Sequence, residues 1–129
     1  MGRRISQEAL SRGHEVVGVV RDPAAVQPPD PRVRLVKGNA TRAEDVARVV
    51  RGADAVVSAI SPRPNARGLP APSLATNARA RTGKYRTTGD RLLTDSAGKS
   101  FISFEDYAVA VLDELERPRH IGERFGVAY

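Results

Sequence analysis

Arg21 is the residue whose place in the sequence most strongly suggests chemistry. It directly follows the apolar run at residues 16–20, and Asp22 and Pro23 come next. Such a run is typical of a buried strand, and ligands of open α/β sheets bind beyond the carboxyl ends of the strands. The planar guanidinium matches phosphate oxygens, so an arginine at a strand end is suited to binding a phosphate. The alternative is a solvated arginine at the start of a loop, paired with Asp22.

Other side chains that could do chemistry have no partners nearby in the sequence. Ser61 has no neighbouring His or Asp, so a hydrolase is not supported. His14 and His120 are single and are interpreted as surface residues rather than catalytic bases. The chain has no G-x-x-x-x-G-K-[ST] motif, which excludes a P-loop. It has no Cys, which excludes disulfides and thiolate metal sites.

The segments around Arg21 alternate between helices and strands. Gly13 is expected to end a first helix. A second helix is expected to begin at a capping box formed by Thr41 and Glu44 and to end at Gly52. The predicted elements are a helix at 3–12, a strand at 15–20 covered on both faces, a strand at 33–36, the capped helix, and a strand at 55–60. The second helix is expected to bury one face, made of Ala43, Val46, Ala47 and Val50. This order is typical of a parallel α/β sheet.

The rest of the chain has a different pattern. Residues 61–82 hold several prolines and are predicted to be a loop or linker. A hairpin is expected over 83–103, with extended segments at 85–87, 92–94 and 100–103. Ser103 and Asp106 then cap a helix that ends before Pro118, and residues 125–129 form a last short strand. The expected buried stripe of that helix is Phe104, Ala108, Val111, Leu112 and Leu115.

Three stretches in family order resemble the atypical short-chain dehydrogenase/reductase group, whose members are NAD(P)H-binding, NmrA-like or flavin-reductase-like proteins. They are GRRISQEALSRGHEVVGVVRDPA, VRLVKGNATRAEDVARVVRGADAVVSAISPRP, and the tail from TGKYRTTGD to the end. The resemblance implies an α/β fold: an incomplete Rossmann-like parallel sheet with flanking helices, followed by a C-terminal hairpin and helix.

The same resemblance assigns cofactor-binding positions. Gly2 corresponds to the last glycine of the phosphate loop, and Arg21 to the arginine that accepts the 2′-phosphate, so NADP (NADPH) is expected in preference to NAD. Asn39 stands where the family usually has Asp beside the adenine, which keeps an acceptor and drops the charge. The cofactor-binding residues implied in this way are Gly2, Arg21, Asn39, Ala40, Ala59, Ile60 and Ser61.

The resemblance also implies segments that this chain lacks. In the family an apolar strand and a glycine-rich loop precede the position of Gly2, where this chain has only Met1. A second gap is expected near 75–82, as if the chain were truncated at its start and internally deleted. We therefore expect one partial NAD(P)-binding domain over 1–129: a Rossmann part at 1–74 without its first strand, a junction at 75–82, and a C-terminal segment at 83–129. Sheet edges left open in this way would favour self-association.

Catalytic residues are not evident in the sequence. Short-chain dehydrogenases use Tyr with Lys four residues later, but Tyr85 is followed at that distance by Gly89 and Tyr107 by Val111, and Tyr129 is the last residue. Two functions therefore stay open. One is an NADPH-dependent reductase of a small acceptor, with doubtful activity in this form, and the other is a non-catalytic, NmrA-like nucleotide sensor.

Charge and hydropathy limit the partners. The net charge is +6, carried by 18 Arg and 3 Lys that are scattered, and aromatic residues make up only 5%. A nucleic-acid binder is thus a weaker third interpretation, because it lacks a dense basic run and stacking side chains. No apolar stretch approaches a membrane span and no signal peptide is visible, so the expected location is the cytoplasm.

Overall fold

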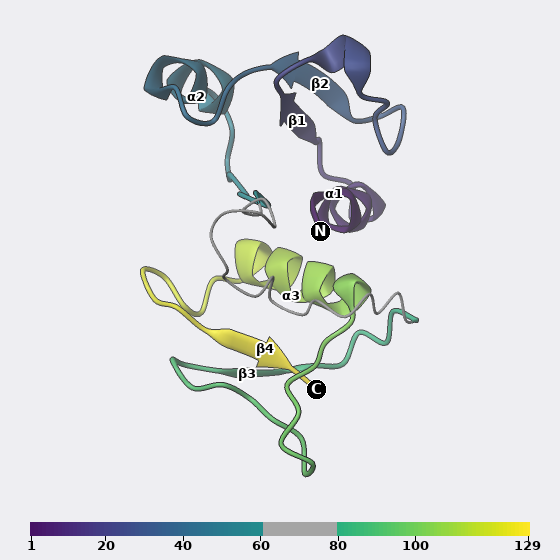
Figure 1. The fold of residues 1–129 in the computed structure, drawn as a ribbon, viewed down its shortest axis with the longest axis vertical. Coiled ribbons are helices and arrows are strands. Elements are labelled where there is room, and N and C mark those ends of the chain that lie inside the picture. The colour runs from purple at the N-terminus through teal and green to yellow at the C-terminus, as the bar shows by residue number, and fades with distance from the viewer. Residues whose placement is uncertain (61–79) are drawn as a thin grey trace, which may run out of the picture. The chain divides into compact units, whose positions relative to one another are not determined.

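The computed structural model describes residues 1–60 and 80–129. These residues divide into two compact units. One is Ser6–Ser58, and the other joins Met1–Ile5 to the described residues from Ala59 to Tyr129. The mixed α/β architecture predicted from the sequence is confirmed, with a parallel strand pair early in the chain and an antiparallel pair near its end (Figure 1).

The first element is helix α1, Gly2–Ser11, and it matches the predicted helix closely. Ile5, Ala9 and Leu10 are all buried, as the helical spacing of these residues predicts. Gly13 follows with a φ of 86°, the left-handed conformation in which glycine ends helices. The turn therefore directs the chain into the first strand.

Strands β1 (Val17–Val20) and β2 (Arg34–Lys37) lie side by side and run parallel (Figure 1). The connection between them includes a short 3₁₀ helix, η1 (Pro23–Ala25). A Cβ built on Gly18 would lie 2.9 Å from Leu35, so the glycine gives that side chain room on one face of the sheet. The expectation that β1 is covered on both faces is wrong, because 41% of Val17 and 45% of Val19 are exposed.

Helix α2, Ala43–Val50, begins differently from the prediction. Arg42 is its N-cap residue and makes no side-chain capping bond, so the T-x-x-E capping box is not formed. The hydroxyl of Thr41 donates instead to Oδ1 of Asn39 at 2.8 Å, and the amide of Thr41 donates to the same oxygen at 3.1 Å. The side chain of Thr41 is thus engaged with the turn that precedes it, and the helix begins one residue later than the capping box predicts.

The apolar face expected on α2 is not buried. None of its residues is buried, and Val46 is 36% exposed. Residues 55–60 were expected to form a strand, and they do not. Val56 and Ile60 are 65% and 73% exposed, and neither sheet of the described chain includes this segment. A β-branched run becomes a strand only when another strand supplies its hydrogen bonds, so propensity alone is not sufficient.

The C-terminal part contains β3 (Arg86–Thr88), α3 (Phe104–Glu116) and β4 (Gly126–Ala128). The antiparallel pair expected there is confirmed, but β3 pairs with β4. Residues 92–94 and 100–103 are not strands. A tight turn lies between them, in which Asp95 accepts from the amides of Ala97 and Lys99.

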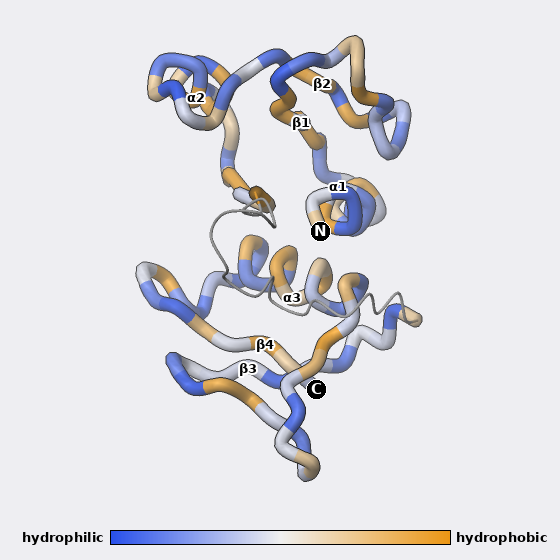
Figure 2. Tube along the Cα trace, viewed as in Figure 1, coloured by the Kyte–Doolittle hydropathy of each residue, from blue (hydrophilic) through white to orange (hydrophobic). Residues whose placement is uncertain are grey.

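Helix α3 is rich in apolar residues (Figure 2). Ala108, Val109, Ala110 and Leu112 are buried. The predicted stripe is correct at Ala108 and Leu112, but Leu115 is 43% exposed. None of the helices in the described ranges is long and apolar enough to cross a membrane.

Candidate functional site

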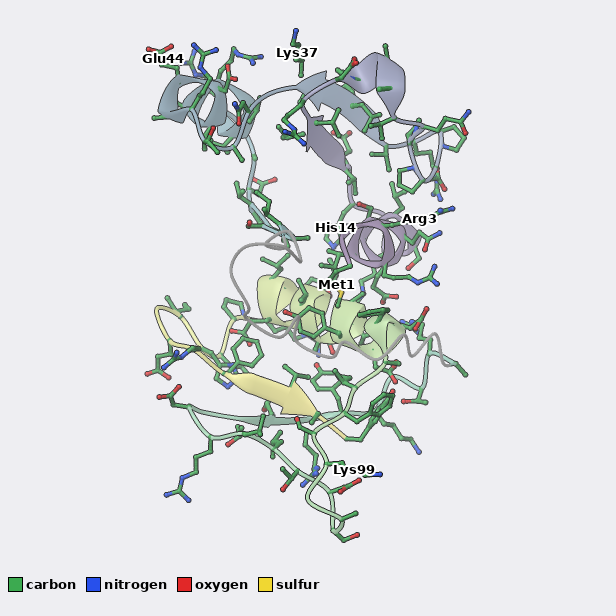
Figure 3. All side chains as sticks on the ribbon, viewed as in Figure 1. Met1, Arg3, His14, Lys37, Glu44 and Lys99 are labelled. Atoms are coloured by element: carbon green, nitrogen blue, oxygen red, sulfur yellow. The ribbon has the colours of Figure 1, made fainter. Side chains whose placement is uncertain are left out.

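The carboxyl ends of β1 and β2 meet at one edge of the parallel sheet. Val20 pairs with Lys37, and the amide of Gly38 donates to the carbonyl of Val20 at 2.9 Å. Arg21 and Asn39 follow these strand ends directly, so two of the predicted site residues leave the sheet at the same edge. Lys37 extends away from the ribbon at this end of β2 (Figure 3).

Arg21 is exposed, and it forms no ion pair with its neighbour Asp22. The carboxylate of Asp22 caps η1 by accepting from the amide of Ala24 at 3.1 Å. No ion pair links Arg21 and Asp22, although both lie in the described ranges. The pairing considered as the alternative role of Arg21 is thus not formed, and its guanidinium is accessible to an anion.

Asn39 is half-buried, and its groups have distinct partners. Its Oδ1 accepts two hydrogen bonds from Thr41, which uses both lone pairs of that oxygen. Its backbone amide donates to Oδ2 of Asp45 at 2.9 Å. The side chain therefore offers a donor, its NH₂ group, rather than the acceptor that the resemblance implied. Ala40, next in the chain, is exposed.

Asp45 contacts this site through the amide of Asn39, and the sequence analysis does not name it as a site residue. The amide of Asn39 and the guanidinium of Arg48 hold the pKa of Asp45 below its ordinary value of 3.8. It supplies a fixed negative charge beside the turn after β2. The only sequence signal was an acidic residue in the first turn of a helix, which is usually read as helix-dipole stabilisation.

The start of α1 is the second place where predicted residues meet. A Cβ added to Gly2 would lie 3.4 Å from the Cβ of Ala59, so residues 2 and 59 are neighbours. The carbonyl of Met1 accepts the first helical bonds, from Arg4 and Ile5, and no acidic residue lies in the first turn. The free amides of such a turn attract anions.

The remaining predicted residues take part in neither of these two places. Ile60 is exposed and outside any strand. Ser61 and most of the predicted junction at 75–82 lie outside the described residues. The structure therefore brings Gly2 close to Ala59. It places Arg21, Asn39 and Ala40 beyond the carboxyl ends of β1 and β2.

A buried polar cluster lies in the C-terminal part, around Asp106. Its Oδ1 accepts from the amides of Thr82 (2.9 Å) and Gly83 (2.7 Å), and its Oδ2 accepts from the hydroxyls of Thr82 (2.7 Å) and Tyr129 (2.6 Å). Burial raises the pKa of Asp106, but the bonds from Tyr129, Thr82 and Gly83 outweigh this effect, and the pKa lies below 3.8. A carboxylate held by four donors has a structural role and is not available as a base.

The hydroxyls of two of the three tyrosines also donate to carboxylates. Tyr85 donates to Asp113 at 2.5 Å, and Tyr129 donates to Asp106. His120, expected at the surface, is half-buried: its Nδ1 lies 2.8 Å from Glu114 and its ring stacks on Phe125 with centroids 4.3 Å apart. Within the described ranges, no group of three His, Cys, Asp or Glu side chains could hold a metal ion.

Parallel strands whose carboxyl edge presents an exposed arginine are characteristic of α/β nucleotide-binding folds. Residues 1–84 match the sequence profile of the family described as NAD(P)H-binding. This match covers more than half of the chain, and the chain therefore belongs to the NAD(P)H-binding family. The resemblance inferred from the sequence is confirmed.

The chain is also similar to individual proteins. A 47-residue stretch is 53% identical to protein YwnB of Bacillus subtilis strain 168, and covers 36% of this chain and 22% of YwnB. A provisionally assigned epimerase of Bacteroides thetaiotaomicron is 26% identical, with a TM-score of 0.80, over 99% of this chain and 91% of the other. A provisionally assigned NADH-flavin reductase of Streptococcus pneumoniae is 18% identical, with a TM-score of 0.60 over 98% and 93%, which shows a shared fold.

The cofactor class of this family is a nicotinamide dinucleotide, and the described residues fit one in two respects. The first turn of α1 offers backbone amides and has no acidic residue of its own, although Glu105 of α3 pairs with Arg4 there at 2.8 Å. Arg21 offers an exposed guanidinium at the carboxyl end of β1. Both groups attract phosphate.

Proposed function

We propose that this chain binds NADPH and that Arg21 selects it over NADH. The observation that carries the proposal is the exposed guanidinium of Arg21 at the carboxyl edge of β1, left unpaired because Asp22 caps η1. A 2′-phosphate adds an anion that an accessible arginine can bind through two hydrogen bonds. NADH lacks this group and would gain nothing from Arg21.

The other predicted residues would hold the rest of the nucleotide. Asn39 and Ala40 would lie beside the adenine, with the NH₂ of Asn39 donating to a ring nitrogen. The amides at Gly2 would bind the diphosphate, and Ala59, Ile60 and Ser61 would lie on the nicotinamide side. The bound cofactor would supply a hydride, and the proposed activity is reduction of a small acceptor, in line with the flavin-reductase name of one relative.

Thermal unfolding with nucleotide fragments tests the proposal. A ligand that binds only the folded chain raises the unfolding midpoint. We expect 2′,5′-ADP to raise it more than 5′-AMP, and NADPH more than NADH. Arg21→Ala should abolish the difference within each pair. Arg34→Ala is the matched control, because Arg34 is exposed at the opposite end of the same sheet, paired with Val17. Equal shifts by NADPH and NADH in the unaltered chain would contradict the proposal.

A second function, nucleotide sensing without turnover, is favoured by the tyrosines. The hydroxyls of Tyr85 and Tyr129 are engaged by Asp113 and Asp106, and Lys does not follow any Tyr at a spacing of four. NADPH oxidation with flavin or quinone acceptors separates the two functions. Binding with turnover supports the reductase, and binding without turnover supports the sensor.

A further inference from the structure

The outer edge of β1 is an unused hydrogen-bonding surface in the described chain. The carbonyls of Val16 and Val20 accept from β2, from Arg34 at 3.1 Å and Gly38 at 2.9 Å. Backbone groups alternate sides along a strand, so the amides and carbonyls of Val17 and Val19 face away from β2. The sheet has only two strands, β1 and β2, in the part of the chain that the structure describes.

This edge lacks the features that usually protect an open strand. Its outward residues, Val17 and Val19, are 41% and 45% exposed, and residues 17–20 contain no Lys or Pro and pair with β2 without a bulge. Exposed edges of this kind pair with strands from other chains. The edge is therefore open to a partner strand, and the sequence indicates which one fits.

The sequence around Gly18 is symmetric in a way that suits pairing with itself. Residues equally far from Gly18 are Val17 and Val19, then Val16 and Val20, then Glu15 and Arg21. In an antiparallel pair centred on Gly18, each residue lies opposite its counterpart in the other copy. Val17 then faces Val19 of the second copy, and Gly18 faces Gly18.

The same register satisfies both the backbone and the charges. Val17 and Val19 would form two hydrogen-bonded pairs with the second copy, using every outward amide and carbonyl of the two residues. Glu15 would lie opposite Arg21 at both ends of the contact, and all four side chains are exposed. Opposite charges directly across an antiparallel pair stabilise it.

We propose that β1 is a self-association surface whose partner is β1 of a second copy, antiparallel and centred on Gly18. The product is a four-stranded sheet, β2–β1–β1–β2, with two-fold symmetry. The contact is short, so the dimer should form in a concentration-dependent manner. Nucleotide is not needed for it, and because Arg21 would face Glu15 of the other copy, the dimer and a 2′-phosphate would compete for the same guanidinium.

Sedimentation equilibrium of the full chain, without nucleotide, tests this surface. We expect a monomer–dimer equilibrium that Val17→Lys with Val19→Lys shifts to monomer. Val46→Lys is the control, since Val46 is an exposed valine on α2, away from the edge. A chain that stays monomeric near 1 mM, or a dimer that the edge lysines leave unchanged, would overturn the proposal.

Charge reversal tests the register and does not depend on the valines. Glu15→Arg alone, or Arg21→Glu alone, places like charges opposite each other and should weaken the dimer. The double variant restores opposite charges and should recover it at least several-fold relative to either single variant. A double variant no better than the singles would exclude this antiparallel register. Both side chains are exposed, so folding, checked by circular dichroism, should be preserved.

Discussion

Asp106 and Tyr129 are 23 residues apart in the sequence, and the hydroxyl of Tyr129 donates to Oδ2 of Asp106 at 2.6 Å. The same hydroxyl lies 2.9 Å from Oγ of Ser103, which caps the N-terminus of α3. The bond therefore fastens the residue that follows β4 to the first turn of α3. Asp106 also binds Thr82 and Gly83, so one carboxylate joins three separate segments.

We expect Asp106→Asn to lower the free energy of unfolding by about 2 kcal/mol, because an amide cannot accept from all four donors. Tyr129→Phe should cost about 1 kcal/mol, since it removes one donor and leaves the carboxylate three. Asp90→Asn is the matched control: its side chain is 73% exposed and pairs only with exposed Arg124, so the expected change is near zero. Urea unfolding measures all three. Equal effects at positions 90 and 106 would contradict a structural role for the buried carboxylate.

Glu114 should make stability depend on acid pH. Hydrogen bonds from the side chain and backbone of His120 hold its pKa at about 2, below the ordinary 4.5. The folded chain therefore favours the ionised form. Its contribution is complete above pH 4.5 and is lost as the pH falls from 4.5 towards 2. Glu114→Gln should flatten the stability profile in this window. A carboxyl ¹³C resonance of Glu114 with a midpoint near 4.5 would contradict this account.

Two signals contained within one turn of the chain are predicted correctly from the sequence. Gly13 was expected to end α1, and it does so with a positive φ. Ser103 was expected to cap α3, and its Oγ accepts from the amide of Asp106 at 3.0 Å. In both cases the donor, the acceptor and the conformational constraint lie within a few residues of each other.

Features that need a distant partner could not be read in this way. The run at 55–60 has strand propensity, but a strand also needs a neighbour, and the described chain provides none. The capping box at Thr41 is a local exception: Thr41 has the sequence of a cap, but its hydroxyl donates to Asn39, two residues earlier, and α2 begins with Arg42 as its N-cap. The donors to Asp106 at Thr82 lie 24 residues away, and no spacing rule connects them.

Two glycines provide a matched test of backbone conformation. Gly13 has a φ of 86°, which side chains rarely adopt, so Gly13→Ala should lower the free energy of unfolding by about 1 kcal/mol. Gly89 does not have a positive φ, and a Cβ there would meet nothing within 4 Å, so Gly89→Ala should be close to neutral. Thermal unfolding of both variants makes the comparison. A larger loss at Gly89 would show that conformation is not what selects glycine at position 13.

Asp45 should act on nucleotide binding by positioning the turn after β2. Its carboxylate accepts from the amide of Asn39 at 2.9 Å, so Asp45→Ala leaves that turn without its anchor. If the adenine lies beside Asn39 and Ala40, as proposed, 5′-AMP and 2′,5′-ADP should both bind several-fold more weakly, by a common factor. The ratio of the two affinities should be unchanged, because Arg21 is not altered.

Titration calorimetry with both nucleotides separates this effect from that of Arg21→Ala, which should reduce the ratio. Glu44→Ala, in the same helical turn and exposed, is the control and should leave both affinities unchanged. A change in the ratio caused by Asp45→Ala would mean that Asp45 acts on the 2′-phosphate itself rather than through the turn.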